Sequence, residues 1–217
     1  MGKTAIILGA TGLTGGLLLD NLLKNTLYDR VKLFSRRTVG FKDPKLEEHL
    51  VDLLELESQG REFTGDVVFC CIGTTKAKTP NEELYRKIDH GIPVAAAKLA
   101  KANGIETFIV ISAMGADPGS RIFYNKVKGE MEAEVLKQEI PRTYILQPSL
   151  IGGKRSEKRF GEQLAKIFMG YLGFLIPKRY KMIAPEDIAT AMQILVLKGS
   201  KEHRISSDII INIATHN

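Results

Sequence analysis

The chain opens with Lys3-Thr-Ala-Ile-Ile-Leu8, then Gly9-Ala-Thr-Gly-Leu-Thr-Gly15, then Gly16-Leu-Leu-Leu-Asp-Asn-Leu-Leu-Lys24. The first run is short and continuously apolar, which is typical of a buried parallel strand, and the leucines of the last run recur at helical spacing. Glycines permit a tight turn and a close approach of backbone N–H groups to a phosphate, and the helix that begins near Leu13 points its partly positive end at the same place. The stretch therefore predicts a strand, a phosphate-binding turn and a helix.

The spacing G-x-x-G-x-x-G differs from the common dinucleotide pattern G-x-G-x-x-G. A glycine-rich turn that binds nothing is the alternative, but the position between an N-terminal strand and an amphipathic helix favours a binding turn. The residues expected to hold the cofactor here are Gly9, Thr11, Gly12, Leu13, Thr14 and Gly15.

Length and composition limit the remaining choices. The 217 residues suit a single domain over 1–217, with a small substrate-side cap within 148–217. No apolar run approaches the roughly 20 residues that span a bilayer, and the N-terminus lacks a signal-peptide pattern, so we expect a cytoplasmic protein. A net charge of +6 favours phosphate-bearing ligands, but without a continuous basic helix or arm it does not indicate nucleic-acid binding.

Strand and helix patterns alternate along the chain, which predicts an α/β fold with a doubly wound parallel sheet, the Rossmann fold. The adjacent Cys70 and Cys71 fall in an apolar run and suit a buried structural role. Strands are expected at 3–8, 30–35, 49–51, 66–73, 106–111 and 142–147, and helices at 13–24, 81–103, 122–138, 160–172 and 185–196, with 209–213 left open between helix and strand.

Ligands of such sheets bind beyond the carboxyl ends of the strands. After the second strand, Ser35, Arg36 and Arg37 offer a hydroxyl and two guanidiniums, which suit a 2′-phosphate and favour NADP(H) over NAD(H); a solvated charged turn is the alternative. Asp52 follows the third strand, where it would accept from the adenine amino group or cap a helix.

Two further segments are expected beside the cofactor. The small residues Gly73, Thr74 and Thr75 follow the fourth strand, where the backbone would approach the ribose and nicotinamide; an ordinary loop is the alternative. Pro148 follows the sixth strand, ends its hydrogen-bonded ladder and would pass near the nicotinamide.

Catalytic candidates follow the fifth strand. Ser112 closes that strand, and Tyr124 and Lys128 begin the next helix as a Y-x-x-x-K pair on one helix face. A second match, Tyr28 and Lys32, lies far from the expected ligand edge and is set aside.

The three side chains suggest hydride chemistry at a carbonyl. A phenol has an ordinary pKa of about 10, and a neighbouring ammonium is expected to lower that pKa. Tyr124 would then exchange a proton with the substrate oxygen, Ser112 would hydrogen-bond the same oxygen, and Lys128 would also bind the nicotinamide ribose. A half-buried tyrosine and a solvated lysine are the alternative.

Together the glycine turn, Ser112 and Tyr124-x-x-x-Lys128 resemble the short-chain dehydrogenase/reductase superfamily in its atypical NAD(P)-binding branch. A closer likeness is to the Tat-interacting-protein oxidoreductase group, through residues 70–75, 112–117 and 127–130. The resemblance implies a Rossmann fold, NADPH binding and reductase activity on a carbonyl. It also implies a second class, because members of this branch act as regulators or protein partners. No asparagine can be assigned to the fourth catalytic position that many reductases use.

We therefore expect an NADP(H)-dependent oxidoreductase that reduces a small carbonyl substrate, with a non-catalytic NADP(H)-binding regulator as the alternative. Basic clusters at 154–159 and 178–181 suit either a solvated surface or an anionic substrate or partner. No metal is expected, and a homodimer or a protein partner is compatible with the sequence.

Overall fold

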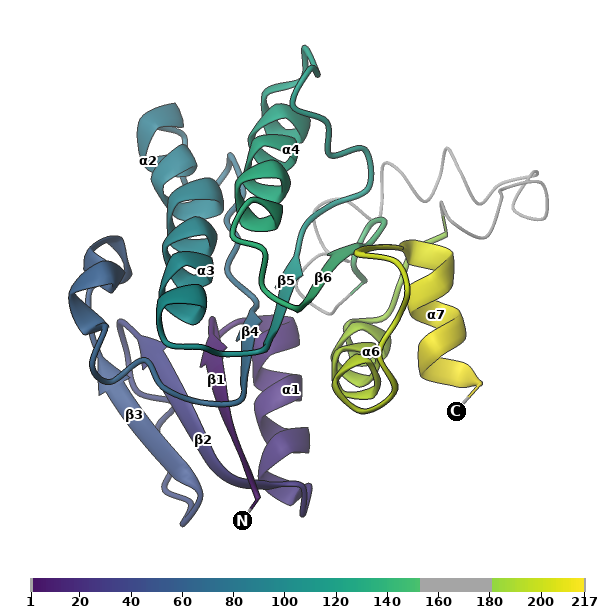
Figure 1. Cartoon of the computed structure of the whole chain (residues 1–217). Helices are drawn as coiled ribbons and strands as arrows, with labels where there is room; N and C mark the ends of the chain where they lie inside the picture. The colour runs from purple at the N-terminus through teal and green to yellow at the C-terminus, as the bar shows by residue number, and fades with distance from the viewer. Residues whose placement is uncertain (1, 153–180, 217) are drawn as a thin grey trace.

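The computed structural model describes residues 2–152 and 181–216. Its centre is a parallel sheet of seven described strands in the order β3-β2-β1-β4-β5-β6-β7 (Figure 1). The order reverses direction between β1 and β4, which is where the ligands of doubly wound sheets bind. The strands are β1 (Lys3–Leu8), β2 (Tyr28–Ser35), β3 (Leu46–Leu50), β4 (Val67–Cys70), β5 (Thr107–Ile111), β6 (Arg142–Gln147) and β7 (Arg204–Ser206).

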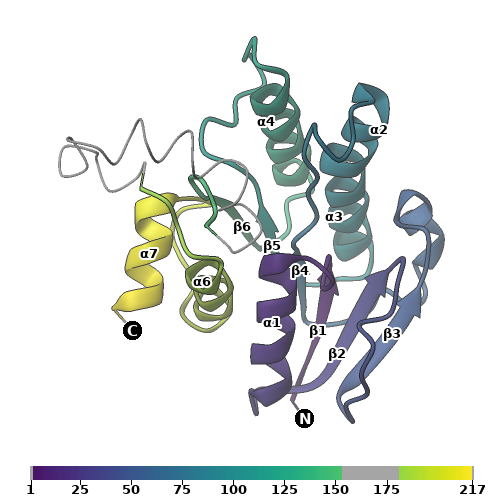
Figure 2. The same cartoon turned by 180° about the vertical axis from the view of Figure 1, so that it is seen from behind.

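Helices cover both faces of the sheet. Helices α3 and α4 lie on one face (Figure 1), and the opposite view shows α1 and α6 on the other, with α7 beside α6 (Figure 2). The described helices are α1 (Leu13–Lys24), α2 (Glu82–Arg86), α3 (Ile92–Ala102), α4 (Phe123–Leu136), α6 (Pro185–Lys198) and α7 (Ser207–Thr215), with a 3₁₀ segment η1 (Leu53–Gln59) and a π turn η2 (Lys87–Gly91).

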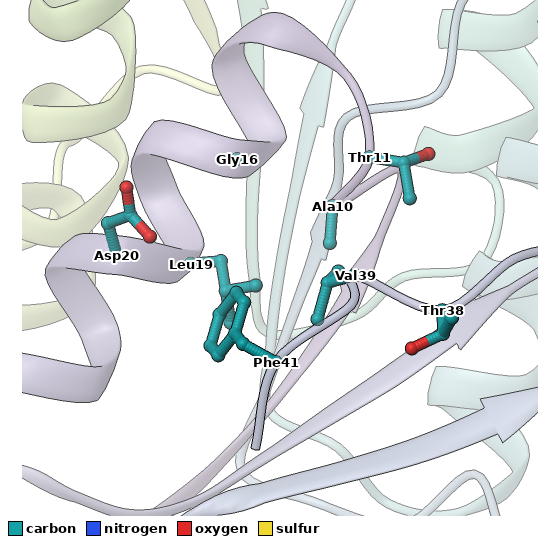
Figure 3. A pocket seen from close by; sticks show the side chains of 8 residues that line it. All are labelled: Ala10, Thr11, Gly16, Leu19, Asp20, Thr38, Val39 and Phe41. Carbon is teal, nitrogen blue, oxygen red and sulfur yellow. The ribbon is translucent and has the colours of Figure 1, made fainter. Parts of the chain in front are cut away.

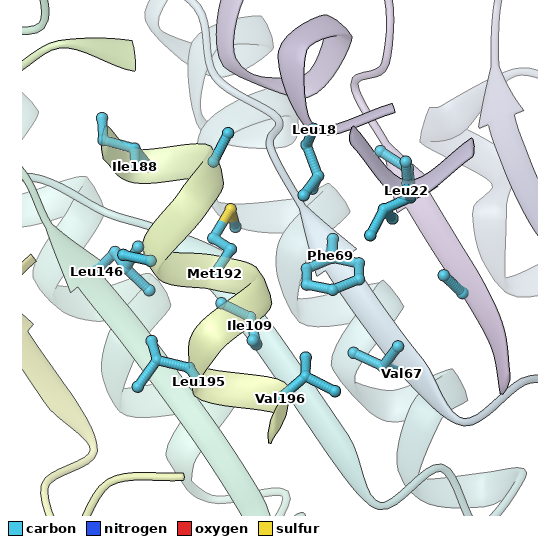
Figure 4. Close-up of a cluster of buried hydrophobic side chains, with 14 of the residues drawn as sticks. Leu18, Leu22, Val67, Phe69, Ile109, Leu146, Ile188, Met192, Leu195 and Val196 are labelled. Atoms are coloured by element: carbon cyan, nitrogen blue, oxygen red, sulfur yellow. The ribbon is translucent and has the colours of Figure 1, made fainter. Parts of the chain in front are cut away.

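Alternate strand residues feed two cores because successive side chains on a strand point to opposite faces. Between the sheet and helices α1 and α6, Phe69, Ile109 and Met192 are fully buried (Figure 4). On the other face, Phe34 and Phe108 pack under η1, α3 and α4. The two cores fix the strand ends, and with them the positions of the loops at the ligand edge.

The predicted doubly wound fold is confirmed, with differences in its elements. β7 was not predicted, because its three residues contain a single buried apolar side chain, Ile205. The predicted strand 49–51 is β3, which begins at Leu46; Glu47 and Glu48 hide its first half from an apolar-run criterion. The predicted strand 66–73 ends as a strand at Cys70.

The described part of the C-terminal region contributes one strand, β7, and two helices, α6 and α7. The isoleucine run 209–213 is helical within α7, and the described part of 148–217 completes the sheet and its second helical layer. The remainder of the predicted cap, including the expected helix 160–172 and most of both basic clusters, lies outside the described residues. Within residues 2–152 and 181–216, no helix has the length and apolar character to cross a membrane.

Candidate functional site

The glycine turn between β1 and α1 has the tight geometry that the sequence predicts. Gly9 has φ +89°, and a Cβ on Gly15 would lie 2.2 Å from the carbonyl oxygen of Gly9. The Gly12 N–H donates to that same oxygen at 2.9 Å, and Gly12 caps α1 without any side-chain hydrogen bond. The first N–H groups of α1 therefore stay open to a phosphate, so the turn fits the pyrophosphate of a dinucleotide.

At the end of β2, Ser35 is buried whereas Arg36 and Arg37 are exposed. The Ser35 hydroxyl is buried and donates to the carbonyl oxygen of Arg37 at 2.8 Å, so it closes the turn and is not presented to a ligand. Asp52 caps η1, with Oδ1 accepting from the Leu54 N–H at 3.0 Å, which is the helix-capping alternative.

A cavity of about 330 Å³ lies beside the glycine turn, between α1 and the loop that follows Arg37 (Figure 3). Glu48 on β3 holds that loop, because its carboxylate accepts from the Thr38 hydroxyl and from the Val39 N–H, each at 2.8 Å. Thr11 and Thr38 line the cavity together with Val39. It therefore adjoins the part of the site expected to hold the adenosine end.

The loop after β4 is fixed by a residue that the sequence reasoning missed. Asp89 is fully buried, and its Oδ1 accepts from the Thr74 N–H at 2.7 Å. Gly73 and Thr75 on either side are exposed. The Tyr85 hydroxyl donates to the Thr74 carbonyl oxygen at 3.4 Å, and burial with the charge of Asp89 raises the pKa of Tyr85.

Asp89 reaches this place because it lies on the π turn η2. Pro93 has no N–H, and a proline ring crowds the carbonyl four residues earlier, which belongs to Asp89. The predicted continuous helix 81–103 therefore widens at that point. Asp89 could have been found from the sequence, because it lies four positions before a proline inside a helical pattern. Such a proline disturbs the helix at that residue, and the π turns that result are frequent at functional sites.

Tyr124 and Lys128 lie one turn apart on α4, as predicted, but Lys128 already has a charged neighbour. Its Nζ is 3.8 Å from Asp89 Oδ2, and both side chains are buried. The Lys128 Nζ also lies 3.5 Å from the carbonyl oxygen of Ile111, at the end of β5. The Lys128 ammonium is thus held at the carboxyl end of β5.

The expectation that Lys128 lowers the pKa of Tyr124 is wrong for this structure. Burial first, and then the negative charge of Asp89, raise the pKa of Tyr124 to about 12. Asp89 offsets the ammonium because the two charges are paired. Tyr124 is still 40% exposed as a residue, so a phenol with a raised pKa is accessible to a ligand as a proton donor.

Ser112 is buried at the end of β5, and its hydroxyl donates to Glu132 Oε1 at 2.6 Å. Glu132, the second residue missed from sequence, follows Lys128 by one further turn of α4. Tyr124, Lys128 and Glu132 therefore form a stripe at i, i+4 and i+8, which was a readable signal of one helix face.

Two further candidates from the sequence are Pro148 and the pair Tyr28 and Lys32, which was set aside. Pro148 is buried directly after β6, and its carbonyl oxygen accepts from the Met114 N–H at 2.9 Å, which ties together the loops after β5 and β6. The discarded pair Tyr28 and Lys32 lies within β2, and the Lys32 Nζ donates to the carbonyl oxygen of Glu62 and the hydroxyl of Thr64. Setting that pair aside is consistent with its buried place in the sheet.

Comparisons with known proteins identify a family of NAD(P)H-binding proteins. A family model described as NAD(P)H-binding matches residues 9–164. The chain is 36% identical over 185 residues to Protein HTATIP2 of Rattus norvegicus, covering 81% of this chain and 76% of the relative. It is 37% identical over 158 residues to the Debaryomyces hansenii protein named Protein FMP52, mitochondrial, covering 72% and 70% of the two chains.

A solved UDP-glucose 4-epimerase from Thermotoga maritima, crystallised with UDP-glucose, has a similar fold. The TM-score is 0.69 at 15% identity, with 94% of this chain and 76% of the epimerase covered. At that identity the likeness concerns the fold alone.

Proposed function

Because the chain belongs to the NAD(P)H-binding atypical branch of the short-chain dehydrogenase/reductase superfamily, we propose that it is an NADP(H)-dependent oxidoreductase that reduces a small carbonyl compound. The observation that supports the proposal is the position of Lys128, which shares a face of α4 with Tyr124 and lies at the carboxyl end of β5. Lys128 Nζ lies 3.5 Å from the carbonyl oxygen of Ile111, the residue that precedes Ser112. The glycine turn opens at the carboxyl end of the sheet as well.

Different residues of the chain would bind different parts of the cofactor. The glycine turn would hold the pyrophosphate, and Arg36 with Arg37 would hold a 2′-phosphate, which is the reason to favour NADP(H). Lys128 would donate to the nicotinamide ribose, and the backbone at Gly73 and Pro148 would line the same end of the cofactor. A bound reduced nicotinamide supplies the hydride.

Tyr124 is the residue proposed to move the proton. Its raised pKa favours the protonated phenol, which can donate its proton to the substrate oxygen. Asp89 keeps Lys128 in place and opposes formation of the phenolate until the arrangement of charges around Tyr124 changes.

The test uses the Tyr124→Phe variant, which keeps the ring and removes the proton. We expect turnover of NADPH with a panel of aldehydes and ketones to fall by at least about 100-fold, since general acid catalysis contributes on that order. NADPH affinity, measured by quenching of its fluorescence, should be nearly unchanged.

A non-catalytic NADP(H)-binding regulator remains the second candidate function. The buried Lys128–Asp89 pair favours it, because a lysine already paired with a carboxylate suits a structural role as well as a catalytic one. Tight NADPH binding by the wild type without turnover of any member of the panel would decide for the regulator.

A further inference from the structure

The loop that follows β2 is held by hydrogen bonds on both sides of its second residue. On one side, the buried Ser35 hydroxyl donates to the carbonyl oxygen of Arg37 at 2.8 Å. On the other side, Glu48 on β3 accepts from the Thr38 hydroxyl through Oε2 and from the Val39 N–H through Oε1, each at 2.8 Å. Both carboxylate oxygens of Glu48 are therefore committed to this one loop.

The same loop forms one wall of the cavity beside the glycine turn. Thr38 and Val39 line that cavity, together with Ala10 and Thr11 of the glycine turn (Figure 3). The Val39 side chain also packs against the core beneath α1. Arg37 is exposed and directly precedes these lining residues, so the conformation of the loop determines where its guanidinium can reach.

The hydroxyl of Thr38 is committed within the loop. It donates to Glu48 and accepts from the Gly40 N–H at 3.1 Å, and Gly40 has φ +83°. A phosphate at this place would therefore be held by arginine and by backbone N–H groups. Arginine recognises phosphate through a rigid fork of donors, and the measured affinity falls with the fraction of time that the binding conformation is populated.

We propose that Glu48 is a positioning residue that fixes the loop after β2 in the conformation that receives the 2′-phosphate of NADP(H). The inference rests on the proposed function, in which Arg36 and Arg37 hold that phosphate. Glu48 makes no contact with the phosphate in this proposal; it acts through Arg37, whose backbone it orders by way of Thr38 and Val39.

The negative charge of Glu48 acts on a phosphate in the opposite sense, because like charges repel. Two substitutions separate positioning from charge. Glu48→Gln removes the charge and keeps both hydrogen bonds, since the amide oxygen accepts from the Val39 N–H and the NH₂ group donates to the Thr38 hydroxyl oxygen. Glu48→Ala removes the charge and both hydrogen bonds.

The experiment titrates the wild type and both variants with NADPH and with NADH, following the nicotinamide fluorescence. We expect Glu48→Ala to weaken NADPH by about tenfold and to leave NADH nearly unchanged, because a loop that is ordered a tenth of the time binds that much more weakly. Glu48→Gln should stay close to the wild type. Glu47→Ala is the matched control, because the neighbouring Glu47 pairs instead with Arg30 and His49.

A double-mutant cycle tests whether Glu48 acts through Arg37. If it does, Glu48→Ala should add little to the loss of NADPH affinity in Arg37→Ala, since the effects of coupled residues are not additive. Thr38→Val removes one of the two hydrogen bonds to Glu48 and gives the same test if Glu48→Ala does not fold. It should also weaken NADPH more than NADH.

Three results would overturn the inference. They are an unchanged ratio of NADPH to NADH affinity in folded Glu48→Ala or in Thr38→Val, a tightening of NADPH binding in both Glu48 variants, and fully additive losses in the cycle with Arg37→Ala. Equal binding of NADPH and NADH by the wild type would instead contradict the cofactor preference in the proposed function.

Discussion

Asp89 is the residue whose charge most affects Tyr124. Its Oδ2 is buried, makes no hydrogen bond within the described part of the chain, and lies 3.8 Å from the Lys128 ammonium. The negative charge raises the pKa of Tyr124, in addition to the effect of burial. A carboxylate held in this way is a tuning group for the phenol as well as a tether for the loop after β4.

Replacement of Asp89 by Asn should lower the pKa of Tyr124 from about 12 toward its ordinary value of about 10. The amide keeps the acceptor for the Thr74 N–H but removes the charge, and it leaves the Lys128 ammonium uncompensated. Tyrosinate absorbance titrations of Asp89→Asn, with and without Tyr124→Phe, measure the shift. Glu83→Gln is the control, an acid paired with Lys87 on the surface of α2. An unchanged Tyr124 titration would contradict the role of Asp89.

Arg36 and Arg37 are the residues proposed to favour NADP(H) over NAD(H). A charge-assisted hydrogen bond contributes about 1.5–3 kcal/mol, so loss of even one in the double replacement by Ala should weaken NADPH binding by at least about tenfold and leave NADH binding nearly unchanged. Fluorescence titration with both cofactors measures the difference. Arg61→Ala serves as the control, because Arg61 is exposed in the loop that leads into β4, at the opposite edge of the sheet. Equal losses for NADPH and NADH would contradict the assignment.

Of the two adjacent glycines in the first turn of α1, only Gly15 is required for the close approach to the glycine turn. A Cβ on Gly15 would meet the Gly9 carbonyl oxygen at 2.2 Å, whereas a Cβ on Gly16 would approach the Ala10 carbonyl oxygen at 3.3 Å. Gly15→Ala should therefore displace the turn and weaken NADPH by about tenfold or more, since overpacking costs about 1–3 kcal/mol.

Gly16→Ala is the matched control for that element. Its small displacement is offset by the better helix propensity of alanine, about 1 kcal/mol, so stability and NADPH affinity should stay close to the wild type. Equal effects of the two substitutions on NADPH titration would show that the turn geometry does not control binding.

Helix α4 illustrates what could be predicted from sequence and what could not. The spacing of Tyr124 and Lys128 predicted a shared helix face, and the structure extends that face to Glu132. The partners of these side chains come from elsewhere in the chain: Asp89 from a π turn that Pro93 imposes, and Arg204 from an edge strand of three residues. Periodicity identifies a face of a helix, but long-range charge pairing depends on the tertiary packing, so the direction of the Tyr124 pKa was predicted wrongly.

For the molecule as a whole, the pattern of strands and glycines was sufficient to predict the doubly wound sheet. Buried parallel strands have continuous apolar runs, which is why β1, β5 and β6 were found within a residue of their bounds. β7 was missed, and with it the completion of the sheet, because a short edge strand buries too little to leave a pattern. The ligand edge follows from the sheet order, so the sequence alone was sufficient to predict which loops lie at that edge.

The proposed function requires that a hydride leaves the cofactor at this edge of the sheet. The most direct measurement supplies the wild-type protein with NADPH carrying deuterium at the transferable position of the nicotinamide, together with the panel of aldehydes and ketones, and analyses the products by mass spectrometry. We expect an alcohol with one deuterium on the former carbonyl carbon, and at least about 100-fold less of it in the same time with Tyr124→Phe. Recovery of every carbonyl compound unchanged, with NADPH bound tightly, would contradict it.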